Sequence, residues 1–174
     1  CYATGILECV SGGTVDTCVE GSQTGNDDNC NGIDENCNGI PDDNSFCLSI
    51  GETNISNIII ITDTYNILLE SDIIGIFDSS AITNEDCNNI INGELLVGSS
   101  QWLDEISITI DAIGSEDNCD ISGQLFPGFV ENNEMLLKLI RNDQLYMVDY
   151  VLLLGSNTFG ENEVTRILNI IALH

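Results

Sequence analysis

The sequence predicts a mainly β protein, an Ig-like or jelly-roll-like antiparallel β-sandwich that follows a small, irregular, cysteine-rich segment. Apolar residues of the second part recur at every second position, as in Ile106, Ile108 and Ile110, and no helical period lasts for three turns. The composition changes sharply near residue 47. We therefore expect two domains, an N-terminal repeat segment over residues 1–47 and a β-sandwich over residues 48–174.

Seven strands are expected in the second part, each bounded by Gly, Asn, Asp or Ser. They cover residues 57–69, 73–78, 94–101, 105–113, 134–141, 144–154 and 164–173. Seven short strands at this spacing favour an antiparallel sandwich. Two stretches, 58–61 and 167–173, are apolar on both alternating faces. Each is either a central strand of its own sheet or a strand that a neighbouring subunit completes or covers.

Cysteines and acidic residues dominate the first part. Residues 1–47 contain six of the eight cysteines and nine acids but no Lys or Arg, so this segment needs disulfides or metal to fold. The cysteines are even in number and form no C-x-x-C pair, which favours disulfides in an oxidising compartment over a zinc site. The other two, Cys87 and Cys119, lie in polar loops and are expected to pair with each other.

The net charge excludes two classes of partner. The 174 residues include 29 acids and three bases, which gives a formal charge of −26. Nucleic acid and anionic membrane surfaces both require basic clusters, so neither is expected as a partner. No membrane insertion is expected either, because Asp149 interrupts the longest apolar run. The chain begins with Cys1 and not with Met, and we expect a processed, secreted protein of an extracellular surface.

A tandem repeat of seven residues is the most specific motif. Residues 27–33 and 34–40 each place side-chain oxygens at the first, third and fifth positions, then Gly, then an apolar residue. This is the first half of a calcium loop, in which oxygen ligands and a backbone carbonyl surround Ca²⁺. The sequence predicts one or two Ca²⁺ ions, with room for more. The expected ligands are Asp27, Asn29, Asn31 and the Ile33 carbonyl for one ion, and Asp34, Asn36, Asn38, the Ile40 carbonyl and Asp42 for a second. The alternative is a turn region with solvated charge.

Two families are similar to parts of the chain. Residues 30–43 read Cys-Asn-Gly-Ile-Asp-Glu-Asn-Cys-Asn-Gly-Ile-Pro-Asp-Asp and resemble the MopE-like metal-binding repeat of secreted bacterial proteins. That name is associated with copper, but the segment lacks imidazole and thioether ligands, so calcium stays the expected ion. Residues 69–78 resemble the opening of a β-sandwich module of secreted, surface-associated bacterial proteins, and similar motifs follow at 94–102, 106–110, 127–134 and 137–139. The second resemblance implies a noncatalytic role in display or assembly.

Catalysis finds little support in the sequence. The single His is the last residue, His174, and the acidic pairs 104–105 and 116–117 are typical of loops in so acidic a chain. The leading hypothesis is a noncatalytic, extracellular, calcium-binding structural protein, a subunit of a surface fibre or filament assembled by strand or linker exchange between copies. The alternative is a secreted carbohydrate-binding or adhesive module whose partners are glycans and whose calcium is structural. Trp102 is expected to pack in the core rather than to stack on sugar.

Overall fold

The computed structural model describes residues 7–10, 13–16, 30–31, 33–34, 42, 45–103, 106–142 and 144–174. The chain divides into two compact units, Cys1–Ser45 and Phe46–His174. In the first unit, β1 (Leu7–Val10) and β2 (Gly13–Asp16) form an antiparallel hairpin. The described residues contain strands and no helix, so the prediction of an all-β protein is confirmed for this part of the chain.

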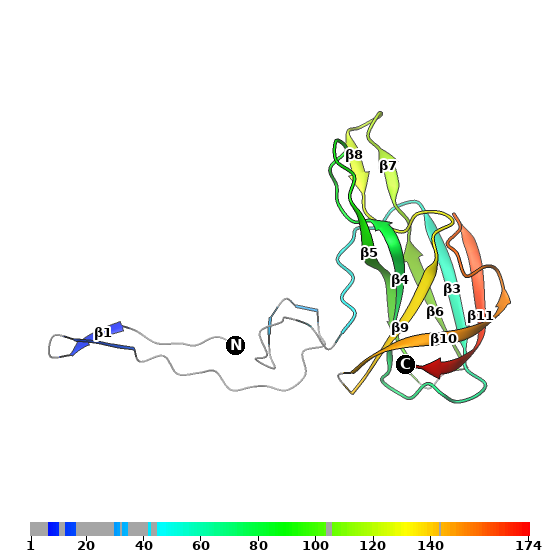
Figure 1. Cartoon of the computed structure of the whole chain (residues 1–174), viewed down its shortest axis with the longest axis horizontal. Coiled ribbons are helices and arrows are strands. Elements are labelled where there is room, and N and C mark those ends of the chain that lie inside the picture. Colours follow the sequence, from blue (N-terminus) through cyan, green and yellow to red (C-terminus); the bar gives the residue numbers. More distant parts are fainter. Residues whose placement is uncertain are drawn as a thin grey trace. The chain divides into compact units, whose positions relative to one another are not determined.

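Seven strands of the second unit form one sheet in the order β5-β4-β9-β10-β11-β3-β6 (Figure 1). All seven were expected from the alternation of apolar residues. Their bounds are β3 (Ser56–Thr62), β4 (Ile73–Ile82), β5 (Asn92–Gln101), β6 (Ser107–Ile113), β9 (Met135–Arg141), β10 (Gln144–Leu154) and β11 (Glu163–Leu173).

The sheet bends at β10, which belongs to both of its halves. Residues 144–147 of β10 pair with β9, and residues 148–154 pair with β11. Register shifts along β10 and β11 accompany the bend, as bulges commonly do. A sandwich would have two separate sheets here, but β10, a strand of 11 residues, pairs with both halves and joins them into one sheet. The predicted two-sheet antiparallel sandwich is corrected to one mixed, nearly closed, barrel-like sheet (Figure 1).

The two edges of the sheet approach each other at Gly98 of β5. A Cβ atom at this position would lie 2.8 Å from the Asp111 carbonyl oxygen and 2.9 Å from the Ile110 Cγ2 atom, both on β6. Only glycine permits so close an approach of strand to strand. Gly98 therefore allows β5 to lie against β6 and nearly closes the barrel.

The pairing of β11 with β3 is parallel, which the sequence analysis did not expect. Asn57 is fully buried at the start of β3, where its Nδ2 donates to the Glu163 carbonyl at 3.2 Å. Its Oδ1 accepts the Gly160 N–H, also at 3.2 Å. One amide side chain thereby joins the beginnings of both strands. Because no hairpin connects β3 to β11, nothing local enforces an antiparallel arrangement.

The core lies inside the curved sheet and consists of the alternate residues of its strands. Phe129 and Phe159 stack at its end with ring centroids 4.6 Å apart. Trp102 is 4% exposed, which confirms the prediction that it packs in the core. Fully or nearly fully buried strand residues include Ile59, Ile61, Ile74, Ile76, Val97, Ile110, Leu137, Leu139, Ile167 and Ile170.

The first expected strand is shorter than predicted, and one hairpin was missed. β3 ends at Thr62 because the Asp63 carboxylate closes the next turn, accepting the Leu68 N–H at 2.6 Å. The prediction that this strand continues to residue 69 is therefore wrong. The missed hairpin pairs β7 (Glu116–Asn118) with β8 (Gln124–Phe126). Its strands have three residues each and no apolar alternation in β7, so they left no periodic signal.

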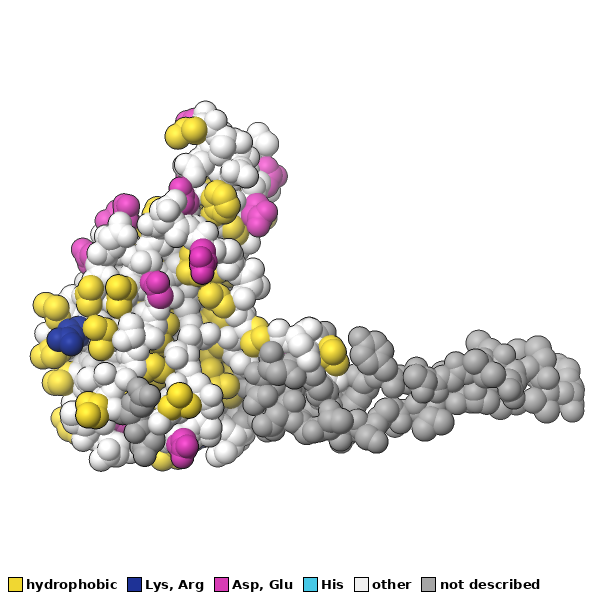
Figure 2. Space-filling model, turned by 180° about the vertical axis from the view of Figure 1, so that it is seen from behind, with side chains coloured by type: hydrophobic (Ala, Val, Ile, Leu, Met, Phe, Trp, Pro, Cys, Tyr) yellow, Lys and Arg dark blue, Asp and Glu magenta, His cyan; other side chains and the backbone are white. Residues whose placement is uncertain are grey.

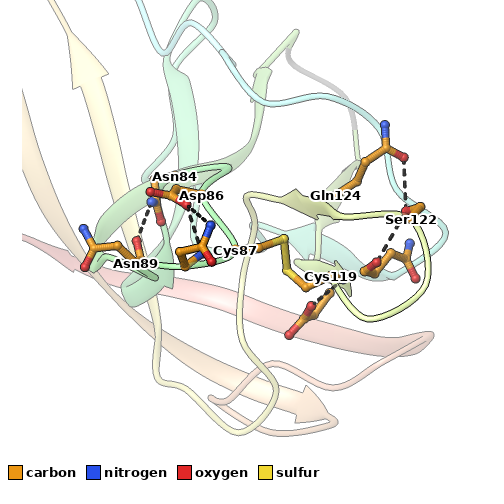
Figure 3. The surroundings of a disulfide bond; sticks show 10 residues. Asn84, Asp86, Cys87, Asn89, Cys119, Ser122 and Gln124 are labelled. Carbon is orange, nitrogen blue, oxygen red and sulfur yellow. Dashed lines mark hydrogen bonds between the residues drawn. A yellow bond between two sulfur atoms is a disulfide. The ribbon is translucent and has the colours of Figure 1, made fainter.

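A disulfide between Cys87 and Cys119 ties this hairpin to the loop between β4 and β5 (Figure 3). The two Cα atoms are 5.6 Å apart. Hydrogen bonds order both loops, since the Asn84 Nδ2 donates to the Asn89 carbonyl at 2.7 Å and the Cys119 N–H donates to Asp117 Oδ1 at 3.0 Å. The predicted pairing of these cysteines is confirmed. Cys30 and Cys47 are disulfide-bonded as well.

Candidate functional site

Four of the predicted calcium ligands lie among the described residues, namely Asn31, Ile33, Asp34 and Asp42. The Asn31 side-chain oxygen accepts the Ile33 N–H at 2.7 Å, which forms an Asx turn. Asp42 Oδ1 accepts the Asn31 N–H at 3.0 Å, so the loop brings residues 11 positions apart into contact. These two residues were assigned to different ions by the sequence analysis.

The other predicted ligands, Asp27, Asn29, Asn36, Asn38 and Ile40, lie outside the described residues. Within the described part of the chain, no three His, Cys, Asp or Glu side chains lie close enough together to hold a metal ion. The predicted ligand sets rely on Asn side chains and carbonyl oxygens besides carboxylates. The calcium assignment therefore stays a prediction for this segment.

Two of the three basic side chains are engaged inside the β unit. Lys138 forms an ion pair with Glu94, and its ammonium lies 4.4 Å from the centroid of the Phe77 ring. Arg141 pairs with Asp72, whose side chain is 2% exposed. Hydrogen bonding to Asp72 raises the pKa of Arg141 above its usual value, which keeps the guanidinium charged. These cations are committed to the fold and are not available to a partner.

Asp78 of β4 has a structural role. This carboxylate is fully buried and accepts the Ser80 and Val130 N–H groups at 2.7 and 2.8 Å. The Asn133 Nδ2 donates to it as well and lies 3.0 Å from each of its two oxygens. Asp78 thus ties residues 127–134 to β4. Two stretches of the sequence analysis, 69–78 and 127–134, thus contact each other through this carboxylate, which has a role in folding.

The third cation, Arg166, lies on an apolar surface that we call the outer face. The outer face consists of Ile58 and Ile60 on β3, Val151, Leu153 and Leu154 on β10, and Val164 and Arg166 on β11. Arg166 lies directly opposite Ile60 of β3 and Leu154 of β10. None of the described carboxylates forms an ion pair with it. Figure 2 shows hydrophobic side chains gathered around a basic side chain on one flank of the β unit.

The outer face is large for a surface patch. Leu153, Leu154 and Val164 are 59%, 57% and 41% exposed. From such exposed fractions the whole face presents on the order of 500 Å², which is near the upper end for the largest apolar patch on a monomer. The nearest acid on β10, Asp149, is already paired with His174 at 2.8 Å. Asp111 of β6, which is exposed, lies directly opposite Ile58 at the margin of the outer face, so Arg166 is the only basic side chain of the face but not its only neighbouring charge.

The acidic pairs considered for catalysis and the aromatic side chains considered for sugar stacking complete the set of candidates from the sequence. Glu116 accepts hydrogen bonds from Asn118 and Asn54, and these bonds lower its pKa, opposite to what a general acid requires. Its partner in the predicted pair, Asp117, accepts the Cys119 N–H. Asp104 and Glu105 lie outside the described residues. Among the aromatic side chains that the structure describes, only Tyr65 is largely exposed, at 64%.

In comparisons with known proteins the chain matches no family model, no curated protein and no solved structure. The described residues include no helix that is long and apolar enough to cross a membrane. The fold and the face thus define the class, an all-β, disulfide-bonded chain with one apolar face around a lone cation. Of the two stretches that the sequence analysis found apolar on both faces, 58–61 contributes Ile58 and Ile60 to the outer face, whereas 167–173 contributes none of the residues that define it.

Proposed function

We propose that the chain is a noncatalytic structural protein of an extracellular surface whose β unit associates with further copies through the outer face. The observation that carries the proposal is the outer face itself, which is apolar and exposed around Arg166. The position of β11 agrees with one of the two expectations for its apolar pattern, a central strand of its own sheet, because β11 lies between β10 and β3 of its own chain. Its outward residues still have no covering layer among the described residues.

Charge supports a second copy as the partner. Arg166 is the one basic side chain without an ion pair in the described structure, and the chain has far more acids, 29, than bases, three. A carboxylate of a neighbouring copy would form a stronger ion pair with Arg166 in these apolar surroundings than in open water. Such an interface joins different surfaces of two copies, and a contact of that kind propagates into a fibre unless it closes into a ring.

The N-terminal segment fits a calcium-binding connector in this proposal. Support comes from the repeat at 27–40 and from the contact that joins Asn31 to Asp42. Oxygen ligands from Asn and Asp are those that Ca²⁺ prefers, and bound cations would also reduce repulsion between copies of such acidic chains. The disulfides support an oxidising compartment, hence a secreted protein.

Sedimentation velocity of two matched variants tests the proposal. Leu153 on the outer face and Leu103 away from it are 59% and 60% exposed. Leu153 exposes roughly 100 Å², and burying it at about 25 cal/mol per Å² contributes up to ~2.5 kcal/mol. We therefore expect Leu153→Ser to weaken self-association between about 10- and 50-fold. Leu103→Ser is the control and leaves the association constant unchanged.

A charge reversal supplies the second arm. Arg166→Glu removes the positive centre of the outer face and weakens self-association in low salt more than in high salt. A wild-type chain that stays monomeric at every concentration and in the presence of Ca²⁺ would contradict the proposal. Equal effects of Leu153→Ser and Leu103→Ser would also contradict it, because the outer face would then be no special surface.

A further inference from the structure

The hairpin of β7 and β8 ends in a turn that exposes an isoleucine. The Ile121 and Ser122 N–H groups both donate to the Asn118 carbonyl, at 3.0 and 2.8 Å, which fixes the turn. Ile121 is 87% exposed, and among the large apolar side chains that the structure describes only Ile106 is more exposed, at 92%. Turns favour Gly, Pro, Asn, Asp and Ser, so neither turn chemistry nor the core of its own chain explains this isoleucine.

The turn lies at one end of the β unit, beside the loop between β4 and β5 (Figures 1 and 3). We call these two segments, residues 84–92 and 116–124, the tip. The disulfide between Cys87 and Cys119 joins them, and hydrogen bonds within each segment hold its backbone. Because the tip is held in one conformation, little conformational entropy is lost when it docks on a partner.

The tip carries negative charge as well as apolar side chains. Its two segments contain no Lys or Arg and five acids, namely Glu85, Asp86, Glu116, Asp117 and Asp120. None of these acids forms an ion pair with a described residue. Figure 2 shows hydrophobic and acidic side chains together at the end of the unit where Figure 1 places β7 and β8. The tip is therefore complementary to an apolar surface that has a free cation.

We propose that the tip of one copy docks on the outer face of the next copy, with Ile121 among its apolar residues and a carboxylate of the tip beside Arg166. The inference rests on the proposed function and names the second surface of that contact. Asp111 lies opposite Ile58, on the β6 side of the outer face. The carboxylates of the tip are therefore favoured on the β10 side, where Leu154 lies opposite Arg166.

The two surfaces are large enough together for a specific contact. Ile90 and Ile91 are 46% and 49% exposed, so with Ile121 the tip presents on the order of 300 Å² of apolar surface. The outer face presents on the order of 500 Å². Interfaces are a little more than half apolar, so burial of both surfaces corresponds to at most about 1,400 Å² in total, which is the size of a standard interface.

The geometry of this contact gives a chain of copies and not a closed pair. The tip lies at the end of the β unit, whereas the outer face lies on the flank formed by β3, β10 and β11 (Figure 1). When the tip of one copy occupies the outer face of another, one outer face and one tip stay free. Further copies can add at both ends, unless the contacts close into a ring.

Sedimentation velocity of the full chain tests the role of the tip. Ile121 is more exposed than Leu153, so we expect Ile121→Ser to weaken self-association at least about tenfold. Ile106→Ser is the matched control, because Ile106 is an equally exposed isoleucine that also follows an acid in the sequence. The control should keep the association constant of the wild type.

Mixing two variants tests whether different surfaces meet. Ile121→Ser keeps its outer face, and Leu153→Ser keeps its tip. At a concentration where neither variant associates alone, the mixture should form a one-to-one complex that does not grow further. The inference is overturned, while the proposed function stands, if Ile121→Ser associates like wild type and Leu153→Ser does not, or if the mixture stays monomeric. A wild-type chain that never associates overturns both.

Discussion

The same substitution can be made at Arg141, whose guanidinium forms an ion pair inside the fold, and at Arg166, whose guanidinium forms none in the described structure. The Arg141 Nε and Nη2 bond the two carboxylate oxygens of Asp72 at 2.8 and 2.5 Å, and Nη2 also donates to the Ile67 carbonyl at 2.8 Å. Arg166 has no ion pair in the described structure and projects from the outer face. Arg→Met at each position removes the charge and keeps an unbranched apolar stem.

The structure gives different magnitudes for the two substitutions. After Arg141→Met the buried Asp72 carboxylate keeps one hydrogen-bond donor among the described residues, the Leu69 N–H at 2.8 Å. Removing one partner of a buried ion pair destabilises a protein by about 3–5 kcal/mol. Because the Arg141 side chain is 20% exposed, we expect the lower end of this range, about 3 kcal/mol. Arg166→Met should change the free energy of unfolding by less than about 0.5 kcal/mol.

The assay is urea unfolding of the full chain, followed by the fluorescence of its single tryptophan, Trp102. Trp102 reports on the surroundings of Asp72, because its backbone N–H donates to the Asp72 carbonyl at 2.8 Å. Measurements at low protein concentration keep self-association from adding to the stability. The reasoning is refuted if Arg141→Met costs less than about 1 kcal/mol, or if both variants unfold at the same urea concentration.

Three further predictions concern metal, disulfide and pH. Chelation by EDTA should expose residues 1–47 to protease, and unchanged protection would contradict calcium binding. Replacing Cys87 and Cys119 by Ser opens a 32-residue loop and should lower the free energy of unfolding by about 3–4 kcal/mol in thermal or urea unfolding. Burial, with Glu134 nearby, raises the pKa of Tyr150 to about 12, so the folded state holds the phenolic proton more tightly. Stability should fall as pH rises from 10 to 12, and Tyr150→Phe should remove this fall.

The strands were predictable because each buries one face. Residues such as Ile59 and Ile61 alternate with outward neighbours, and this period identified all seven strands of the large sheet. The end of β3 was missed because apolar residues resume at 67–69, whereas the Asp63 side chain forms a turn before them. Parallel pairing was also missed, since it depends on the buried Asn57 and not on any periodic pattern.

The candidate sites were less accessible to sequence reasoning. The calcium repeat is a local pattern and could be assigned residue by residue, from Asp27 to Asp42. The outer face is not local, because Ile60, Leu154 and Arg166 come together only through the pairing of three strands. Long-range pairing thus sets this surface.

Site-specific cross-linking tests whether the outer face binds a second copy of the chain. A photoreactive residue placed at Val164, which is 41% exposed on the outer face, is activated in the full chain, and mass spectrometry locates the products. We expect covalent oligomers in which copies of the chain are linked to each other, and we expect their yield to fall when Arg166 is replaced by Glu. Monomer alone at every concentration, or oligomers whose yield is unchanged by Arg166→Glu, would contradict it.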